Sequence, residues 1–174
     1  MKILAFDQAS QVSGYAMFTM SKPDNICLRE YGSLDLSKEK DSNKRVKGMM
    51  ASLCKMVDDQ SPDFVTIEDV SMQKNPNTLI MLSRIQGAVI GHCYAKNIPL
   101  MILKPTEWRK VCGIKQGRVK REVLKQEAMD FIKLAYKVET IDDNEADAVC
   151  IGHATAMILA DDMAKNNKEE NNNG

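Results

Sequence analysis

Apolar and polar positions near the start of the chain form short runs that are typical of strands. Residues 2–7 are an apolar run that ends in an acid, which indicates a buried strand. Residues 14–19 and 26–34 predict two further strands, and Asp24 and Asn25 supply the turn between them. We therefore expect the fold to begin with a three-stranded antiparallel meander.

The rest of the chain alternates between helical and extended patterns. The predicted helices are residues 37–59, 78–96, 120–136 and 144–163, and the predicted strands between them are residues 63–68 and 99–103. The order is βββαβαβα, followed by one more helix. Strands that alternate with helices after a meander predict an α/β fold with a mixed five-stranded sheet and helices on both faces.

The chain shows no internal repeat and no linker. Its 174 residues are a usual length for one domain with a sizeable core. We therefore predict a single domain over residues 1–163. Residues 164–174 are polar and of low complexity, which favours a disordered tail.

Composition narrows the class of protein. Lys and Arg balance Asp and Glu at 24 each, so the overall charge gives no sign of a nucleic-acid or membrane partner. The sequence has no apolar run long enough to span a bilayer, and an acid interrupts the apolar start too early for a signal peptide. Five scattered cysteines without a CxxC spacing favour free thiols in a cytoplasmic protein.

Three acids stand where apolar elements end. Asp7 ends the first strand, Glu68 ends the fourth, and Asp147 lies on the inward-facing stripe of the last helix. A buried carboxylate is costly unless it has a partner, and carboxylates brought together repel each other unless cations neutralise them. The pattern therefore predicts a site for hard divalent ions, most simply two Mg²⁺, as in phosphodiester hydrolysis.

A simpler interpretation of these acids is also open. Acids are common at the ends of strands, and Asp143 or Asn144 could cap the last helix. Asp147 would then be stabilised by the helix dipole. This alternative explains Asp147 least well, because that residue lies on the inward stripe.

A basic stretch occupies residues 104–125. It holds eight Lys or Arg and two Glu, so eight minus two leaves a local charge of +6. Such a patch beside a metal site suits a phosphate backbone, although a solvated helix face is the alternative. Trp108 could stack on a base, but we favour a packing anchor. The candidate DNA contacts are Arg109, Lys110, Lys115, Arg118, Lys120 and Arg121.

Four stretches carry a family resemblance. They are FDQASQVSGYAMF (6–18), FVTIEDVSMQKNPNTLIMLSRIQGAVIG (64–91), LKPTEWRKVCGIKQGRVKREVL (103–124) and DDNEADAVCIGHA (142–154). In this order, they make the chain resemble the RuvC family of Holliday-junction resolvases, and most of all its phage-type members. The resemblance implies the RNase H-like fold of that superfamily.

The resemblance also implies roles for individual residues. Asp7, Glu68 and Asp147 match the family's catalytic, metal-binding acids, and Lys120 matches a basic residue near the scissile phosphate. The family usually has one more acid a turn before the last one. Asp143 lies four residues before Asp147 and Asn144 three, and we favour Asp143 as this fourth catalytic ligand.

Two positions depart from the family's pattern. Gln8 and Ala9 stand where many relatives have Pro-Gly, and Ser71 stands where cellular members carry an aromatic residue that probes the junction centre. These departures affect how the protein would open or sense a junction.

The implied function is a nuclease of DNA recombination and repair. The resemblance implies resolution of four-way junctions by paired nicks, with Mg²⁺ or Mn²⁺ as cofactor. It also implies a homodimer formed through the helix at residues 78–96, in a bacterial host cell if a phage encodes the protein. The alternatives are a nuclease of the same fold acting on flaps, forks or RNA, and a non-catalytic protein that binds branched DNA.

Overall fold

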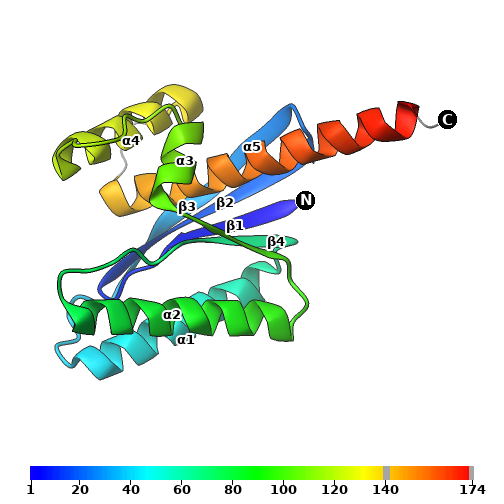
Figure 1. The fold of residues 1–174 in the computed structure, drawn as a ribbon. Coiled ribbons are helices and arrows are strands. Elements are labelled where there is room, and N and C mark those ends of the chain that lie inside the picture. Colours follow the sequence, from blue (N-terminus) through cyan, green and yellow to red (C-terminus); the bar gives the residue numbers. More distant parts are fainter. Residues whose placement is uncertain (139–141, 173–174) are drawn as a thin grey trace.

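The computed structural model describes residues 1–138 and 142–172. Within them, five strands form one mixed sheet in the order β3-β2-β1-β4-β5 (Figure 1). The strands are β1 (Lys2–Asp7), β2 (Val12–Lys22), β3 (Asn25–Asp35), β4 (Phe64–Glu68) and β5 (Leu100–Leu103). β2 is antiparallel to β1 and to β3, while β4 is parallel to β1 and β5 is parallel to β4. The predicted α/β class, meander and mixed sheet are confirmed.

Helices cover both faces of the sheet, as predicted. They are α1 (Ser42–Gln60), α2 (Pro76–Ala95), α3 (Pro105–Val111), α4 (Arg121–Tyr136) and α5 (Asp143–Asn172). α1 and α2 lie on one face, and α5 crosses the other with α3 and α4 beside it (Figure 1). Ile3 and Ala5 pack toward α5, while Leu4 and Phe6 pack toward α1 and α2. β1 is therefore apolar at successive positions because both of its faces are covered.

The structure differs from the predicted elements in three places. α1 begins at Ser42, since the Asp41 side chain caps it by accepting a 2.9 Å hydrogen bond from the Lys44 backbone N–H. α3 was not predicted, because seven residues are too few to show a helical period. α5 continues beyond the predicted end at residue 163 to Asn172, into the segment for which the sequence predicts disorder. Elongation of a helix that packing already holds adds one hydrogen bond per residue.

A glycine on β2 lets α5 lie unusually close to the sheet. Gly14 is paired with Asp7 across the β1–β2 ladder. A Cβ atom at Gly14 would overlap the backbone carbonyl of Asn144 and would lie 3.1 Å from the Cβ of Ala148. The first turns of α5 can therefore rest on the sheet beside the end of β1 only because residue 14 has no side chain.

We expect Gly14→Ala to destabilise the fold by at least about 2 kcal/mol, because the added methyl would meet backbone that cannot move without lifting α5. The matched control is Gly48→Ala in α1, where a Cβ would meet only the Leu36 Cδ1 methyl at 3.2 Å. That variant should stay within about 1 kcal/mol of wild type. Urea denaturation followed by circular dichroism measures both, and equal stabilities of the two variants would contradict the argument.

Candidate active site

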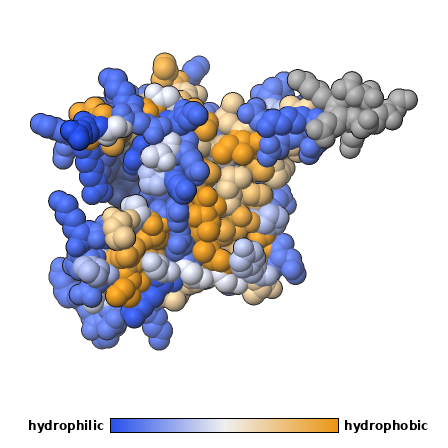
Figure 2. All heavy atoms as spheres, viewed as in Figure 1, coloured by the Kyte–Doolittle hydropathy of each residue, from blue (hydrophilic) through white to orange (hydrophobic). Residues whose placement is uncertain are grey.

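The carboxyl ends of β1 and β4 bring two of the predicted acids together. β1 and β4 are parallel neighbours in which Phe6 pairs with Ile67, so the next residue of each strand is an acid, Asp7 or Glu68. α5 adds Asp147 from its second turn. All three are partly buried and line one cavity of about 420 Å³. Figure 2 shows the face hollowed between the region of α4 and that of α2.

Burial raises the pKa of all three carboxylates, and the charge of Glu68 adds to the rise at Asp7 and Asp147. Burial, followed by the charges of Glu68 and Asp147, raises the pKa of Asp7 well above its usual value. Burial and the charge of Glu68 raise the pKa of Asp147 to about 7. Burial also raises the pKa of Glu68, while a hydrogen bond from Trp108 and the charge of Arg109 act in the opposite direction. Crowded carboxylates of this kind hold protons unless a cation replaces them.

The donor set fits a hard divalent ion. Carboxylate oxygens are the ligands that Mg²⁺ and Mn²⁺ prefer, and three of them share one cavity here. In the part of the chain that the structure describes, no three His, Cys, Asp or Glu side chains converge closely enough to form a metal centre as they stand. The chemistry of the residues, together with the pKa shifts, is therefore what indicates an ion site.

The two candidates for a fourth ligand lie in different surroundings. The carboxylate of Asp143 accepts a hydrogen bond from the Nζ of Lys125, and this contact lowers the pKa of Asp143. Both side chains of the pair are about one-third exposed, at 33% and 32%. Asn144 lines the acid cavity, whereas Asp143 is not part of its lining. The preference for Asp143 thus stays a prediction, and one that requires its ion pair with Lys125 to open.

The basic residues predicted to contact DNA divide into two groups. Arg109 on α3 and Arg121 on α4 line the acid cavity. The others lie outside its lining with exposed side chains: Lys110, Lys115, Arg118 and Lys120. Lys115 forms an ion pair with Glu127 at 3.3 Å. Lys125, from the same basic stretch, also lines the cavity and adds a positive charge that was not among the predicted contacts.

Trp108 packs in the core and also donates a hydrogen bond to Glu68. Its side chain is fully buried, which excludes stacking on a base and confirms the preferred interpretation. Its Nε1–H donates a 2.8 Å hydrogen bond to Oε1 of Glu68. The guanidinium of Arg109 lies 4.7 Å from the centre of the indole ring. The sequence offered one signal for this arrangement, a lone Trp beside Arg just after a strand.

Two glutamines that sequence reasoning missed also hold Glu68. Gln8 is 7% exposed, and its Nε2 donates a 2.5 Å hydrogen bond to the backbone carbonyl of Glu68. Gln86 on α2 donates to the same carbonyl at 3.1 Å. For Gln8 the sequence signal was the departure from Pro-Gly at positions 8 and 9, whereas no signal in the sequence indicated Gln86.

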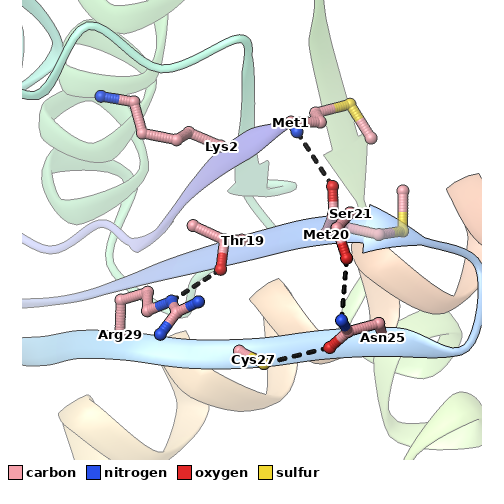
Figure 3. A pocket seen from close by; sticks show the side chains of 8 residues that line it. All are labelled: Met1, Lys2, Thr19, Met20, Ser21, Asn25, Cys27 and Arg29. Atoms are coloured by element: carbon pink, nitrogen blue, oxygen red, sulfur yellow. Dashed lines mark hydrogen bonds between the residues drawn. The ribbon is translucent and has the colours of Figure 1, made fainter.

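A separate cavity of about 250 Å³ lies near the start of β1, at the other end of that strand from Asp7 (Figure 3). Its polar side chains bind one another: Arg29 Nε donates to Thr19 Oγ1 at 2.7 Å, and Asn25 Nδ2 donates to Ser21 Oγ at 2.8 Å. None of the described residues that line it is an acid. It therefore lacks the ligands that the acid cavity provides.

Two further findings concern the cysteines and the lengths of the helices. All five cysteines lie within the described ranges, and their thiols are free as predicted. The lining of the acid cavity contains none of them. In residues 1–138 and 142–172, helices of the length and apolarity needed to cross a membrane are absent.

Comparison with known sequences finds a matching family model and relatives that share most of their length with this chain. A family model described as "Crossover junction endodeoxyribonuclease RuvC" matches residues 3–153. A protein of that name from Chlamydia caviae is 26% identical over 158 residues, covering 88% of this chain and 94% of the relative. Another, from Dictyoglomus thermophilum, is 26% identical over 153 residues, covering 88% and 96%.

Solved structures share the fold at low sequence identity. The structure of T. thermophilus RuvC in complex with Holliday junction substrate superposes with a TM-score of 0.71 at 14% identity, covering 91% of this chain and 95% of that one. The Fowlpox virus resolvase in complex with substrate Holliday junction DNA gives 0.66 at 20% identity, with coverage of 91% and 99%. The RNase H-like architecture predicted from the sequence is confirmed.

The raised pKa of Asp147 predicts a pH-dependent cost in the metal-free protein. Between the ordinary value of 3.8 and about 7, the folded state binds more protons at this site than the unfolded state does, so stability falls as pH rises through that window. Asp147→Asn removes the charge. It should stabilise the protein by a few kcal/mol at pH 8 and scarcely at all near pH 4. Denaturation in EDTA at both pH values measures this, and an equal gain at both would refute it.

The Trp108 hydrogen bond predicts a change in the titration of Glu68. Trp108→Phe keeps most of the buried ring and removes the N–H donor, so the carboxylate loses a partner that favours its charged form. The pKa of Glu68 should rise further in the metal-free variant. Carboxyl ¹³C NMR titration measures the shift, with Asp41, which is remote from the indole, as an internal control. An unmoved Glu68 titration would show that the bond has no electrostatic effect.

Proposed function

The chain belongs to the RuvC family of crossover junction endodeoxyribonucleases, and from this premise we propose that it resolves four-way DNA junctions by nicking two opposed strands at the Asp7, Glu68 and Asp147 site. The observation that carries the proposal is the convergence of these three acids on one cavity, with pKa values that burial raises in all three. Such a site suits hydrolysis of a phosphodiester. The products would be a 5′-phosphate and a 3′-hydroxyl.

The proposed cofactor is Mg²⁺, with Mn²⁺ as a substitute and two ions in each site. When bound, such ions activate water and stabilise the leaving oxygen. Asp7, Glu68 and Asp147 would hold them through carboxylate oxygens. Asn144 could complete the set through its carbonyl oxygen, since it already lines the cavity. Asp143 would bring a further negative charge if Lys125 released it.

The basic residues of the cavity would position the DNA backbone. The cavity is lined by one cation from α3, Arg109, and by two from α4, Arg121 and Lys125. Both helices come after β1 and β4 in the chain. A positive rim beside a carboxylate cluster attracts a phosphate and orients it toward the acids. A second depression of about 500 Å³ shares Arg109 with the cavity and is also lined by Lys104. A DNA strand bound at the acid cavity could continue into this depression beside α3.

We propose that Lys120 approaches the scissile phosphate only when DNA is bound. It is exposed at the residue before α4 and lies outside the cavity lining, while its neighbour Arg121 lies within that lining. Arg121 is thus the better-placed cation in the DNA-free protein. Lys110, Lys115 and Arg118 would contact backbone farther from the cut.

A homodimer would place two such sites on opposed strands. Helix α2 leaves apolar residues exposed, with Ile80 at 47% and Tyr94 at 69%. Apart from the backbone of the helix itself, no described atom lies within 4 Å of where a side chain at Gly87 or Gly91 would begin. An open helix face of apolar and small residues suits close packing against a second copy. Figure 2 shows apolar residues at the surface over α2.

The proposed setting is the cytoplasm, in a bacterial host cell if a phage encodes the protein. The curated relatives include proteins from Chlamydia caviae and Dictyoglomus thermophilum, which are bacteria. In that setting the nuclease would act on branches left by recombination or replication.

The test uses a synthetic immobile four-way junction that is end-labelled on each strand in turn. Wild-type protein with Mg²⁺ should nick two opposed strands at symmetric positions. Asp7→Asn and Asp147→Asn should each lower the cleavage rate by at least about 100-fold, because each removes a charge that the ions need. EDTA should abolish cleavage, while junction binding should persist.

A flap, a Y-fork, an RNA duplex and a plain DNA duplex serve as substrate controls. Lys55→Met serves as a charge control, because Lys55 lies in an exposed pair with Asp59 on α1 and should leave cleavage unchanged. Preferential cutting of the flap or fork would favour a broader branch nuclease. Tight junction binding without a cut under any divalent ion would favour a non-catalytic binding protein.

A further inference from the structure

The loop that follows Asp7 is held by hydrogen bonds within the protein. Gln8 is the first residue after β1, and the chain enters β2 at Val12. Ser13 closes the loop twice, since its Oγ accepts from the Ala9 N–H at 2.8 Å and donates to the Ala9 carbonyl at 2.9 Å. The Leu36 N–H donates a 2.8 Å hydrogen bond to the Gln11 carbonyl. The position of Gln8 is therefore set by the fold.

The Gln8 amide can point in only one direction. Its Nε2 donates to the backbone carbonyl of Glu68, and the reversed amide would bring two acceptor oxygens together. Oε1 consequently faces away from that carbonyl. Gln8 is 7% exposed, and Oε1 has no hydrogen-bond partner among the residues that the structure describes. A buried acceptor without a partner costs about 1–3 kcal/mol.

The acid cavity is where the missing partner can bind, because Gln8 lines it together with Asp7, Glu68 and Asp147. Three cations line the cavity. Lys125 binds Asp143, Arg109 lies over Trp108, and the charge of Arg121 acts on the carboxylates of Asp7 and Glu68. The space that remains is wide enough for ordered water or a hydrated ion. Amide carbonyl oxygens are ordinary ligands of hard divalent cations and of their bound waters.

We propose that Oε1 of Gln8 is an additional oxygen ligand for the divalent ion at Asp7 and Glu68, bound to the ion itself or to a water of its hydration shell. The proposal rests on the proposed function, and it adds a neutral ligand to the carboxylates. A neutral oxygen adds affinity without adding to the repulsion between the acids. The Nε2 of the same amide holds the Glu68 backbone, so one side chain would join the ion to the strand that carries the second acid.

The experiment measures Mn²⁺ affinity of the DNA-free protein by electron paramagnetic resonance, which does not depend on cleavage. Gln8→Met keeps the length of the side chain and removes both polar atoms. We expect it to weaken Mn²⁺ binding by about tenfold. Gln86→Met is the matched control, because it also removes a hydrogen bond to the Glu68 carbonyl but contributes no atom to the cavity lining. It should stay within about twofold of wild type.

Gln8→Glu is a second variant at the same position, which tests the inference even if Gln8→Met does not fold. It keeps an oxygen at this position and adds a charge, so it should bind Mn²⁺ at least as tightly as wild type. Equal affinities of Gln8→Met and wild type would overturn the inference, as would equal weakening by Gln8→Met and Gln86→Met. In either case, an intact wild-type cleavage of junctions would leave the proposed function standing. A wild-type protein that binds Mn²⁺ but cuts no junction would instead refute the proposed function alone.

Discussion

The close approach of α5 to the sheet is the constraint on which the site depends. Asp7 and Glu68 come from neighbouring parallel strands, so β-pairing alone brings them together. Asp147 arrives from a helix, and its distance from the strands is set by how near two backbones can pack. That approach requires a residue without a side chain at Gly14, which lies opposite Asp7 in the ladder and beneath the Asn144 carbonyl. A single missing methyl group therefore determines whether three carboxylates share one cavity.

The cavity that results is electrostatically unfavourable to the folded protein alone. Burial raises the pKa of each of the three acids, and the charge of Glu68 adds to it at Asp7 and Asp147. Nearby groups such as Trp108 and Arg109 offset only part of this cost at Glu68. The rest of the fold offsets the remainder through a two-sided apolar core that surrounds β1. The same repulsion would favour cation binding at the proposed site, because a bound ion would relieve a cost that the folded protein otherwise bears.

The sequence was sufficient for the strands, for helices α1, α2, α4 and α5, and for the positions of the three acids, because these follow from periodicity. A strand that ends in Asp7 or Glu68 and a helix with Asp147 on its inward stripe can be recognised locally. It was insufficient wherever side-chain direction depends on tertiary contacts. The Lys125–Asp143 pair, the Trp108–Glu68 bond and the cavity position of Arg121 each join segments that only the packed structure brings together. Helix α3 was not predicted, because seven residues are too few to show a helical period of apolar positions.

Glu68 is held from three elements at once, and this has a consequence for how the chain can vary. The β1–β2 loop reaches its carbonyl through Gln8, α2 reaches the same carbonyl through Gln86, and α3 reaches its carboxylate through Trp108. Changes at residues that share one partner are not additive in free energy. These three positions, far apart in the sequence, should thus drift as a set during evolution. A substitution at one would be accepted mainly in lineages that have already adjusted another.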